Sequence, residues 1–213
     1  MRFRRFFFRC RPDPFITKYI HRLALSSMGW DVLATDVPNV ISTVLAQNVA
    51  NNIAGLSVDS GMIQIRELDW TLNPDRWIWD DDKVIASGSS PSFQLSPSDA
   101  KDLLQPPFDL IISADTVYSP ALAEPLLRTF HTLCTLSLAA SPSSRPPPVF
   151  LCIERRDPAL VDRLLSDAKE IWQFNVECIP RRKLGKAMEK GGIRWGKEEW
   201  EGVEIWKLTL VRG

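Results

Sequence analysis

Acidic residues close four apolar segments of this sequence, and they are the first candidates for chemistry. Asp36 ends WDVLATD, Asp69 follows MIQIREL, Asp115 follows FDLIISA and Glu154 ends VFLCIE. A short apolar run that is bounded by polar residues is typical of a buried strand. If these strands are parallel, their carboxyl ends meet at one edge of a sheet, where ligands bind in doubly wound folds. The pattern therefore predicts a polar crevice along that edge.

Asp36 and Trp70 have the types expected for contacts to a nucleoside. An acid at the end of the second strand of a dinucleotide-type fold commonly accepts hydrogen bonds from ribose hydroxyls. Trp70 follows the next strand, and its ring could stack on a purine. Two structural alternatives stay open. Asp36 could be the N-cap of a following helix, and Trp70 could be a core tryptophan, since the chain has eight Trp.

The segment ISADTVYSP suggests an acceptor site between a strand and a helix. Asp115 could receive an ammonium group, and Tyr118 could close a pocket with its ring while offering a hydroxyl group. A turn acid followed by a core aromatic residue is the structural alternative. For Glu154-Arg155-Arg156, a salt-bridged strand end is the leading interpretation.

The elements that must position these residues alternate along the chain. Helical periodicity and capping residues predict helices over 15–28, 37–52, 120–138 and 157–172. Apolar or alternating segments predict strands over 30–36, 62–68, 108–114, 149–154, 173–180 and 203–211. The last two strands should form an antiparallel pair across a long charged connection. The pattern predicts an α/β fold with a Rossmann-like, doubly wound sheet that ends in this antiparallel pair.

The chain length fits one domain, which we expect to cover 1–213. Two segments depart from the α/β pattern. Residues 1–14 form an atypical Arg/Phe-rich start, for which a frayed or artificial terminus is favoured over a mitochondrial targeting segment. Residues 71–106 are rich in Pro, Ser, Gly and Asp, and we expect an irregular insertion with a short helix around SDAKDLL.

Composition excludes several classes of partner. Lys and Arg together equal Asp and Glu at 26 each, so no global charge attracts nucleic acid or an anionic membrane. The four cysteines form no CxxC pair and are expected to be reduced core thiols of an intracellular protein. With two histidines and no ligand pair at zinc-finger spacing, no metal site is predicted.

The motifs in combination resemble the seven-strand, S-adenosylmethionine-dependent protein-lysine methyltransferases, and most of all the branch of methyltransferase-like protein 22. The resemblance covers roughly residues 24 to 211 and is carried by ATDVPNVISTVLAQNVANN, IRELDW, DLIISADTVYSPALAEPLLRTF, FLCIERR and VEIWKL. The combination is more specific than any one of its motifs.

The resemblance implies S-adenosylmethionine as cofactor and a protein lysine as substrate. Asp36 would hold the ribose and Trp70 would border the adenine. Ala114 and Asp115, with Tyr118 of the DxxY motif, would line the methionine end and the lysine channel. Methyl transfer to a neutral amine needs alignment more than acid–base groups, so Asp115 and Tyr118 are the expected catalytic residues. We further expect a monomer in the cytoplasm or nucleus, without direct nucleic-acid or membrane contact.

The glycine-rich motif of that family, roughly E-L-G-x-G-x-G, does not occur in this sequence. It should precede the helix at 15–28, yet that region is MRFRRFFFRCRPDPF and the first glycine of the chain is Gly29. Its glycines would let backbone amides approach the cofactor. RFRRFFFRC is moreover expected to be a poor central strand, because four arginines are difficult to bury.

We therefore expect the first strand and glycine loop to be missing or replaced, in a truncated or mis-spliced product or in a degenerate relative, and cofactor binding to be impaired. A non-catalytic interaction protein and a small-molecule methyltransferase are the alternative functions.

Overall fold

The structure, a computed structural model, describes residues 5–10, 20–88, 103–141, 145–192 and 202–211. Its strands are β1 (Arg5–Cys10), β2 (Asp31–Asp36), β3 (Ile63–Leu68), β4 (Val84–Ala86), β5 (Leu110–Ala114), β6 (Val149–Glu154), β7 (Phe174–Cys178) and β8 (Val203–Leu210). Its helices are α1 (Ile20–Ser27), α2 (Pro38–Val40), a π-helical segment (Ile41–Leu45), α3 (Ala46–Ile53), a 3-10 turn (Pro74–Arg76), α4 (Pro120–Ala140), α5 (Pro158–Glu170) and α6 (Arg181–Lys190).

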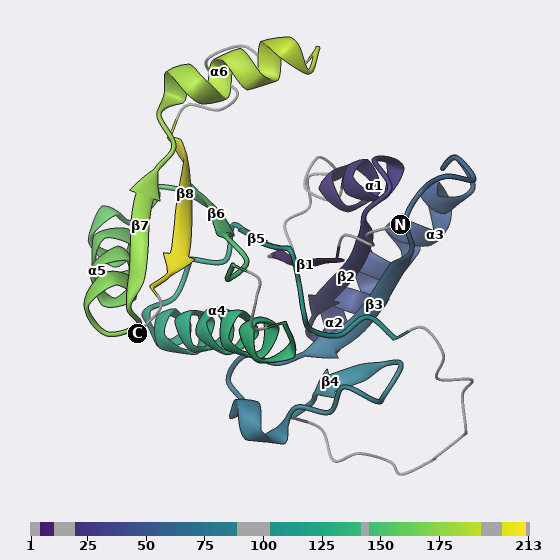
Figure 1. The fold of residues 1–213 in the computed structure, drawn as a ribbon, viewed down its shortest axis with the longest axis horizontal. Coiled ribbons are helices and arrows are strands. Elements are labelled where there is room, and N and C mark those ends of the chain that lie inside the picture. The colour runs from purple at the N-terminus through teal and green to yellow at the C-terminus, as the bar shows by residue number, and fades with distance from the viewer. Residues whose placement is uncertain (1–4, 11–19, 89–102, 142–144, 193–201, 212–213) are drawn as a thin grey trace.

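All eight of these strands form one sheet in the order β4-β3-β2-β1-β5-β6-β8-β7 (Figure 1). Neighbours from β4 to β6 are parallel, and β8 lies antiparallel between β6 and β7. The predicted α/β fold class, with its doubly wound sheet and antiparallel C-terminal pair, is confirmed.

The Arg/Phe-rich segment, which was expected to be unsuitable as a central strand, supplies the central strand β1. β1 pairs in parallel with β2, where Phe8 is opposite Ala34, and with β5, where Cys10 is opposite Ala114. The expectation that this segment makes a poor central strand is wrong for the backbone. The physical reason is that β2 and β5 both present peptide groups that need partners, and three consecutive phenylalanines favour extended structure.

Helices cover the sheet on two faces because the crossovers run in opposite directions from β1. α1 contacts β2 and α3, whereas α4 contacts α5. β2 is buried on both faces: Ala34 packs with Leu45 and Val49, while Leu33 belongs to the main core that includes Phe130 of α4. Such two-sided burial explains why β2 is a continuous apolar run.

Two segments differ from their predicted structure. Within 71–88 most residues form turns and bends, but the structure also has the 3-10 turn and β4, which were not predicted; the apolar triplet of β4 pairs with the otherwise open edge of β3. In SDAKDLL, Leu103 and Leu104 are not helical, and 98–102 lie outside the described residues. The charged connection after β7 contains α6, a helix that its polar sequence did not indicate.

Among the described residues, no helix is both long enough and apolar enough to cross a membrane.

Candidate functional site

The carboxyl end of β1 is the topological switch point of the sheet. From β1 the chain continues to β2 on one side, and it later returns through β5 on the other side. In open α/β sheets, ligands bind at such a point, outside the carboxyl ends of the strands. Asp36 ends β2 and Ala114 ends β5, and the register places both beside the end of β1. Two strand spacings separate them, which corresponds to about 10 Å.

Asp36 lies at this edge with only 3% of its surface exposed. Its Oδ1 atom accepts a hydrogen bond of 2.9 Å from the Val37 backbone N–H, which orients the carboxyl group. The N-cap position of α2 is occupied by Val37, and no side chain caps that helix. The alternative interpretation of Asp36 as an N-cap is therefore wrong, and its role at the ribose stays a prediction.

Asp115 has an unusual backbone conformation directly after β5. Its φ of 54° lies in the left-handed region, which costs most non-glycine residues free energy but which Asp tolerates better than most. Its backbone N–H donates to the Cys152 carbonyl oxygen at 2.9 Å, which ties the turn to β6. Residues held in such conformations concentrate at functional sites, so the geometry supports a functional interpretation of this turn.

The rest of the turn has a buried hydroxyl contact on its inner side and an exposed aromatic side chain on its outer side. The hydroxyl groups of Ser113 and Thr116 are 2.7 Å apart and both residues are buried. Tyr118, two residues further, keeps 43% of its surface exposed. Ala114, Asp115 and Tyr118 thus lie together in the segment between β5 and α4, where the Tyr118 side chain is partly exposed.

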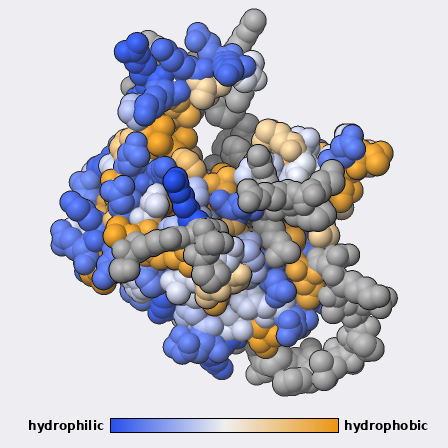
Figure 2. All heavy atoms as spheres, in the orientation of Figure 1, coloured by the Kyte–Doolittle hydropathy of each residue, from blue (hydrophilic) through white to orange (hydrophobic). Residues whose placement is uncertain are grey.

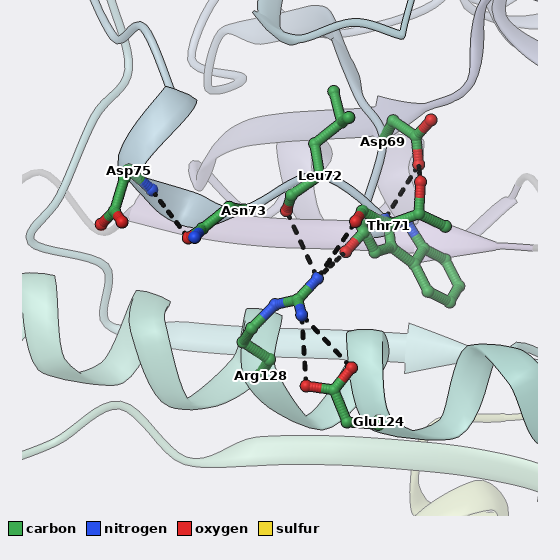
Figure 3. A network of polar contacts seen from close by, with 8 residues as sticks. Asp69, Thr71, Leu72, Asn73, Asp75, Glu124 and Arg128 are labelled. Carbon is green, nitrogen blue, oxygen red and sulfur yellow. Dashed lines mark hydrogen bonds and ion pairs between the residues drawn. The ribbon is translucent and has the colours of Figure 1, made fainter.

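Trp70 lies in the main hydrophobic core and is 3% exposed, which fits the core alternative. Arg128 of α4 anchors the loop that begins at this residue (Figure 3). One guanidinium nitrogen donates to the carbonyl oxygens of Trp70, Thr71 and Leu72 at 3.0, 3.3 and 3.4 Å. The other terminal nitrogen pairs with Glu124 at 3.2 Å. A contact of Trp70 with adenine stays a prediction.

The two remaining strand-end acids have structural partners. Asp69 accepts hydrogen bonds from the Thr71 N–H at 2.9 Å and its hydroxyl at 2.7 Å, which closes a local turn. Glu154 forms an ion pair with Arg156. Arg155 contacts Glu204 at 3.1 Å and Asp162 at 2.8 Å, and the hydrogen bond to Asp162 raises the pKa of Arg155. The salt-bridged strand end is confirmed.

His131 lies apart from this edge, and Cys134 is buried, whereas Cys152 is half-buried and Cys178 is exposed, so the expectation of a core thiol is wrong for Cys178. His131 packs against Trp172 and Phe174. Phe174 is the first residue of β7, so this contact lies at the amino end of the strand, away from the carboxyl edge. Burial lowers the pKa of His131. Burial raises the pKa of the Cys134 thiol to about 12. Within the described residues, no three His, Cys, Asp or Glu side chains gather in a way that could hold a metal ion.

Sequence reasoning missed the groups that support the site. Arg128 donates hydrogen bonds to a loop more than fifty positions earlier in the sequence, and no local sequence pattern predicts such a contact. The Ser113–Thr116 pair had a weak local signal, because hydroxyl residues three positions apart flank the acid of a strand-to-helix turn.

Comparison with known proteins supports the fold. No protein-family model matches the chain, and no curated protein matches it. Among solved structures, the METTL16 methyltransferase domain is 14% identical with a TM-score of 0.49, over 100% of this chain and 61% of that one. The CurJ carbon methyltransferase is 11% identical with a TM-score of 0.50, over 99% of this chain and 49% of that one.

The chain thus spans 61% and 49% of the lengths of these two structures. At such low identity the likeness concerns architecture alone. The chain has a Rossmann-like α/β fold similar to that of a known methyltransferase.

Proposed function

We propose that this chain is an S-adenosylmethionine-dependent methyltransferase that acts on a lysine side chain of a protein. The observation that carries the proposal is the placement of Asp36 on one side of the switch point and of Asp115 and Tyr118 on the other. The likeness to a methyltransferase fold and the motif resemblance of the sequence support it.

The residues present fit one part of the cofactor better than another. A carboxylate at the end of β2 suits the hydroxyl groups of a ribose. No glycine precedes Gly29, so the flexible backbone that approaches a cofactor in glycine-rich loops is not encoded after β1. We therefore expect weak cofactor binding that depends strongly on Asp36.

The acceptor side of the site needs only to hold the lysine amine in line with the methyl group and the sulfur of the cofactor. S-adenosylmethionine, when bound, offers a methyl group on a positively charged sulfur. A neutral lysine amine would take this methyl group, with the electrons of the C–S bond left on sulfur and the amine proton released to water. Asp115 would favour the cationic product electrostatically, and the exposed ring of Tyr118 would form a wall of the lysine channel.

A transfer assay tests this proposal. Purified protein is incubated with cell extract and cofactor labelled in the methyl group, and labelled proteins are separated from labelled metabolites. We expect label in lysine of a protein band, and a reduction of at least about tenfold for Asp115→Asn, because a charge-assisted contact is lost. Arg163→Gln, an exposed change on α5, is the matched control. Label confined to metabolites would instead identify a small-molecule methyltransferase.

A non-catalytic interaction protein is the second candidate, and the missing glycine motif favours it. In that case a pull-down would recover a stable partner from extract, with equal yield for the wild type and Asp115→Ala, and no labelled product would form. Transfer of label by the wild type together with loss of the partner in the variant would refute this second candidate.

A further inference from the structure

α6 stands outside the body of the protein on the same edge as the candidate site. β7 and β6 are both antiparallel to β8, so β7 runs parallel to β6 and its last residue, Cys178, lies at the carboxyl edge. α6 begins at Arg181, three positions later, and Figure 1 shows it beyond that edge, away from the other helices. None of its residues is buried.

The surface of α6 carries a local positive charge in a chain with no net charge. Five basic residues and one acid, Glu189, give it a charge of +4, and Figure 2 shows its hydrophilic surface. Its basic residues, all exposed, are Arg181, Arg182, Lys183, Lys186 and Lys190. Within the described part of the chain, no ion pair involves them.

The sequence of α6 does not favour helix stability. Three cations occupy its first turn, where the helix dipole favours anions, and Pro180 at the N-cap provides no side-chain hydrogen bond. Gly185 inside the helix costs roughly 1 kcal/mol relative to alanine. Local rules are most often broken at functional positions, so these residues suit a binding role better than a structural one.

The arrangement of side chains favours an acidic peptide over other anionic partners. At 100° per residue, Arg182, Lys183, Lys186 and Lys190 share an arc of about 100°. The apolar residues Leu184 and Met188 lie on the other side and are half-buried, so α6 lacks the exposed apolar face that membrane-surface helices insert. It also lacks aromatic residues on which bases would stack.

We propose that α6 binds an acidic segment of the protein substrate, next to the lysine held at Asp115 and Tyr118. The identity of this partner as substrate rests on the function proposed above, while the binding itself does not. Three strand spacings from β5 to β7 amount to about 14 Å, which four or five extended residues span. The ten residues of α6 cover about 15 Å more. The acids should therefore begin about four residues from the lysine and extend to about the ninth.

Fluorescence anisotropy with labelled peptides tests the inference. One peptide carries a lysine with glutamates at the fourth to ninth following positions, and a second has glutamines there. The test variant is Arg182→Gln/Lys183→Gln/Lys186→Gln/Lys190→Gln. A variant with the same charge change on other exposed residues, Lys83→Gln/Arg145→Gln/Arg163→Gln/Lys169→Gln, is the matched control. Circular dichroism verifies that both variants are folded.

We expect the wild type and the control to prefer the glutamate peptide, and the α6 variant to bind it at least about tenfold more weakly, since four exposed ion pairs are lost. Equal affinities of the three proteins, or no binding by the wild type, would overturn the inference. Tighter α6-dependent binding of a single-stranded RNA of equal charge, or of phosphatidylserine vesicles, would overturn it as well. Peptide binding that depends on α6 without any methyl transfer would refute the proposed function and leave this surface established.

Discussion

Substitution of Asp115 by glycine, asparagine and alanine separates the backbone requirement at this position from the chemical one. The φ of 54° places the residue in the left-handed region. Its N–H donates to the Cys152 carbonyl oxygen, and this bond survives any change of side chain. The variants therefore differ in backbone strain and in the carboxylate, and hardly in backbone hydrogen bonding.

The size of the strain effect follows from the conformation. A left-handed residue with a Cβ atom costs roughly 1–2 kcal/mol, which glycine avoids. Glycine in turn loses about 0.5–1 kcal/mol because its unfolded chain is more flexible. Asp115→Gly should consequently be more stable than Asp115→Ala by about 1 kcal/mol, with Asp115→Asn close to the wild type.

Chemical denaturation of the four proteins measures this order, and the transfer assay on the same samples measures function. A gap of about 1 kcal/mol corresponds to roughly 2–4 °C in melting temperature for a chain of this size. We expect Asp115→Gly to be stable and inactive, because the backbone is relieved while the carboxylate is gone. A glycine variant less stable than the alanine variant would refute the strain argument, and an active one would refute the catalytic role of the carboxylate.

Three further predictions concern the support of the fold. Arg128→Gln should destabilise the protein by about 1–3 kcal/mol, because its charged hydrogen bonds to the carbonyl oxygens of Trp70 and Thr71 are lost. Amide hydrogen exchange at Thr71 and its neighbours should become faster, and unchanged exchange would contradict the anchoring role of Arg128. Burial lowers the pKa of His131, so the unfolded state takes up its proton first and the free energy of unfolding should fall as the pH drops below 6.5. His131→Phe should flatten that pH dependence in denaturation curves, and an identical slope would show that other groups cause it. A thiol reagent should modify exposed Cys178 well before buried Cys134, because burial raises the pKa of Cys134 to about 12. Mass spectrometry of digested samples measures the order of modification, and earlier modification of Cys134 would contradict its burial.

The sequence predicted those parts of the fold that local signals encode. α5 begins as expected, with Asp157 accepting the Leu160 N–H at 3.1 Å and Pro158 in the first turn. The apolar strands β2, β5 and β6 occur where their patterns end in acids. These signals are local, so they survive without knowledge of the tertiary structure.

Other features depend on contacts between distant segments and were not predictable in this way. β1 is a strand because two neighbouring strands offer it partners, although its arginines argued against burial. β4 is too short to show a period, and α6 is too polar. The candidate residues Asp36, Ala114, Asp115 and Tyr118 do lie at the predicted edge, but the backbone strain at Asp115 is visible only in the structure.

The most direct test of the central claim is calorimetric titration of the protein with S-adenosylhomocysteine, the stable product form of the cofactor. We predict weak, saturable binding that Asp36→Asn reduces at least about tenfold, since charge-assisted hydrogen bonds to the ribose are lost. Asp31→Asn, at the other end of β2, should leave binding unchanged because the amide oxygen can still accept the Met62 N–H. Absence of binding by the wild type, or equal binding by Asp36→Asn, would contradict a cofactor site at the carboxyl edge of this sheet.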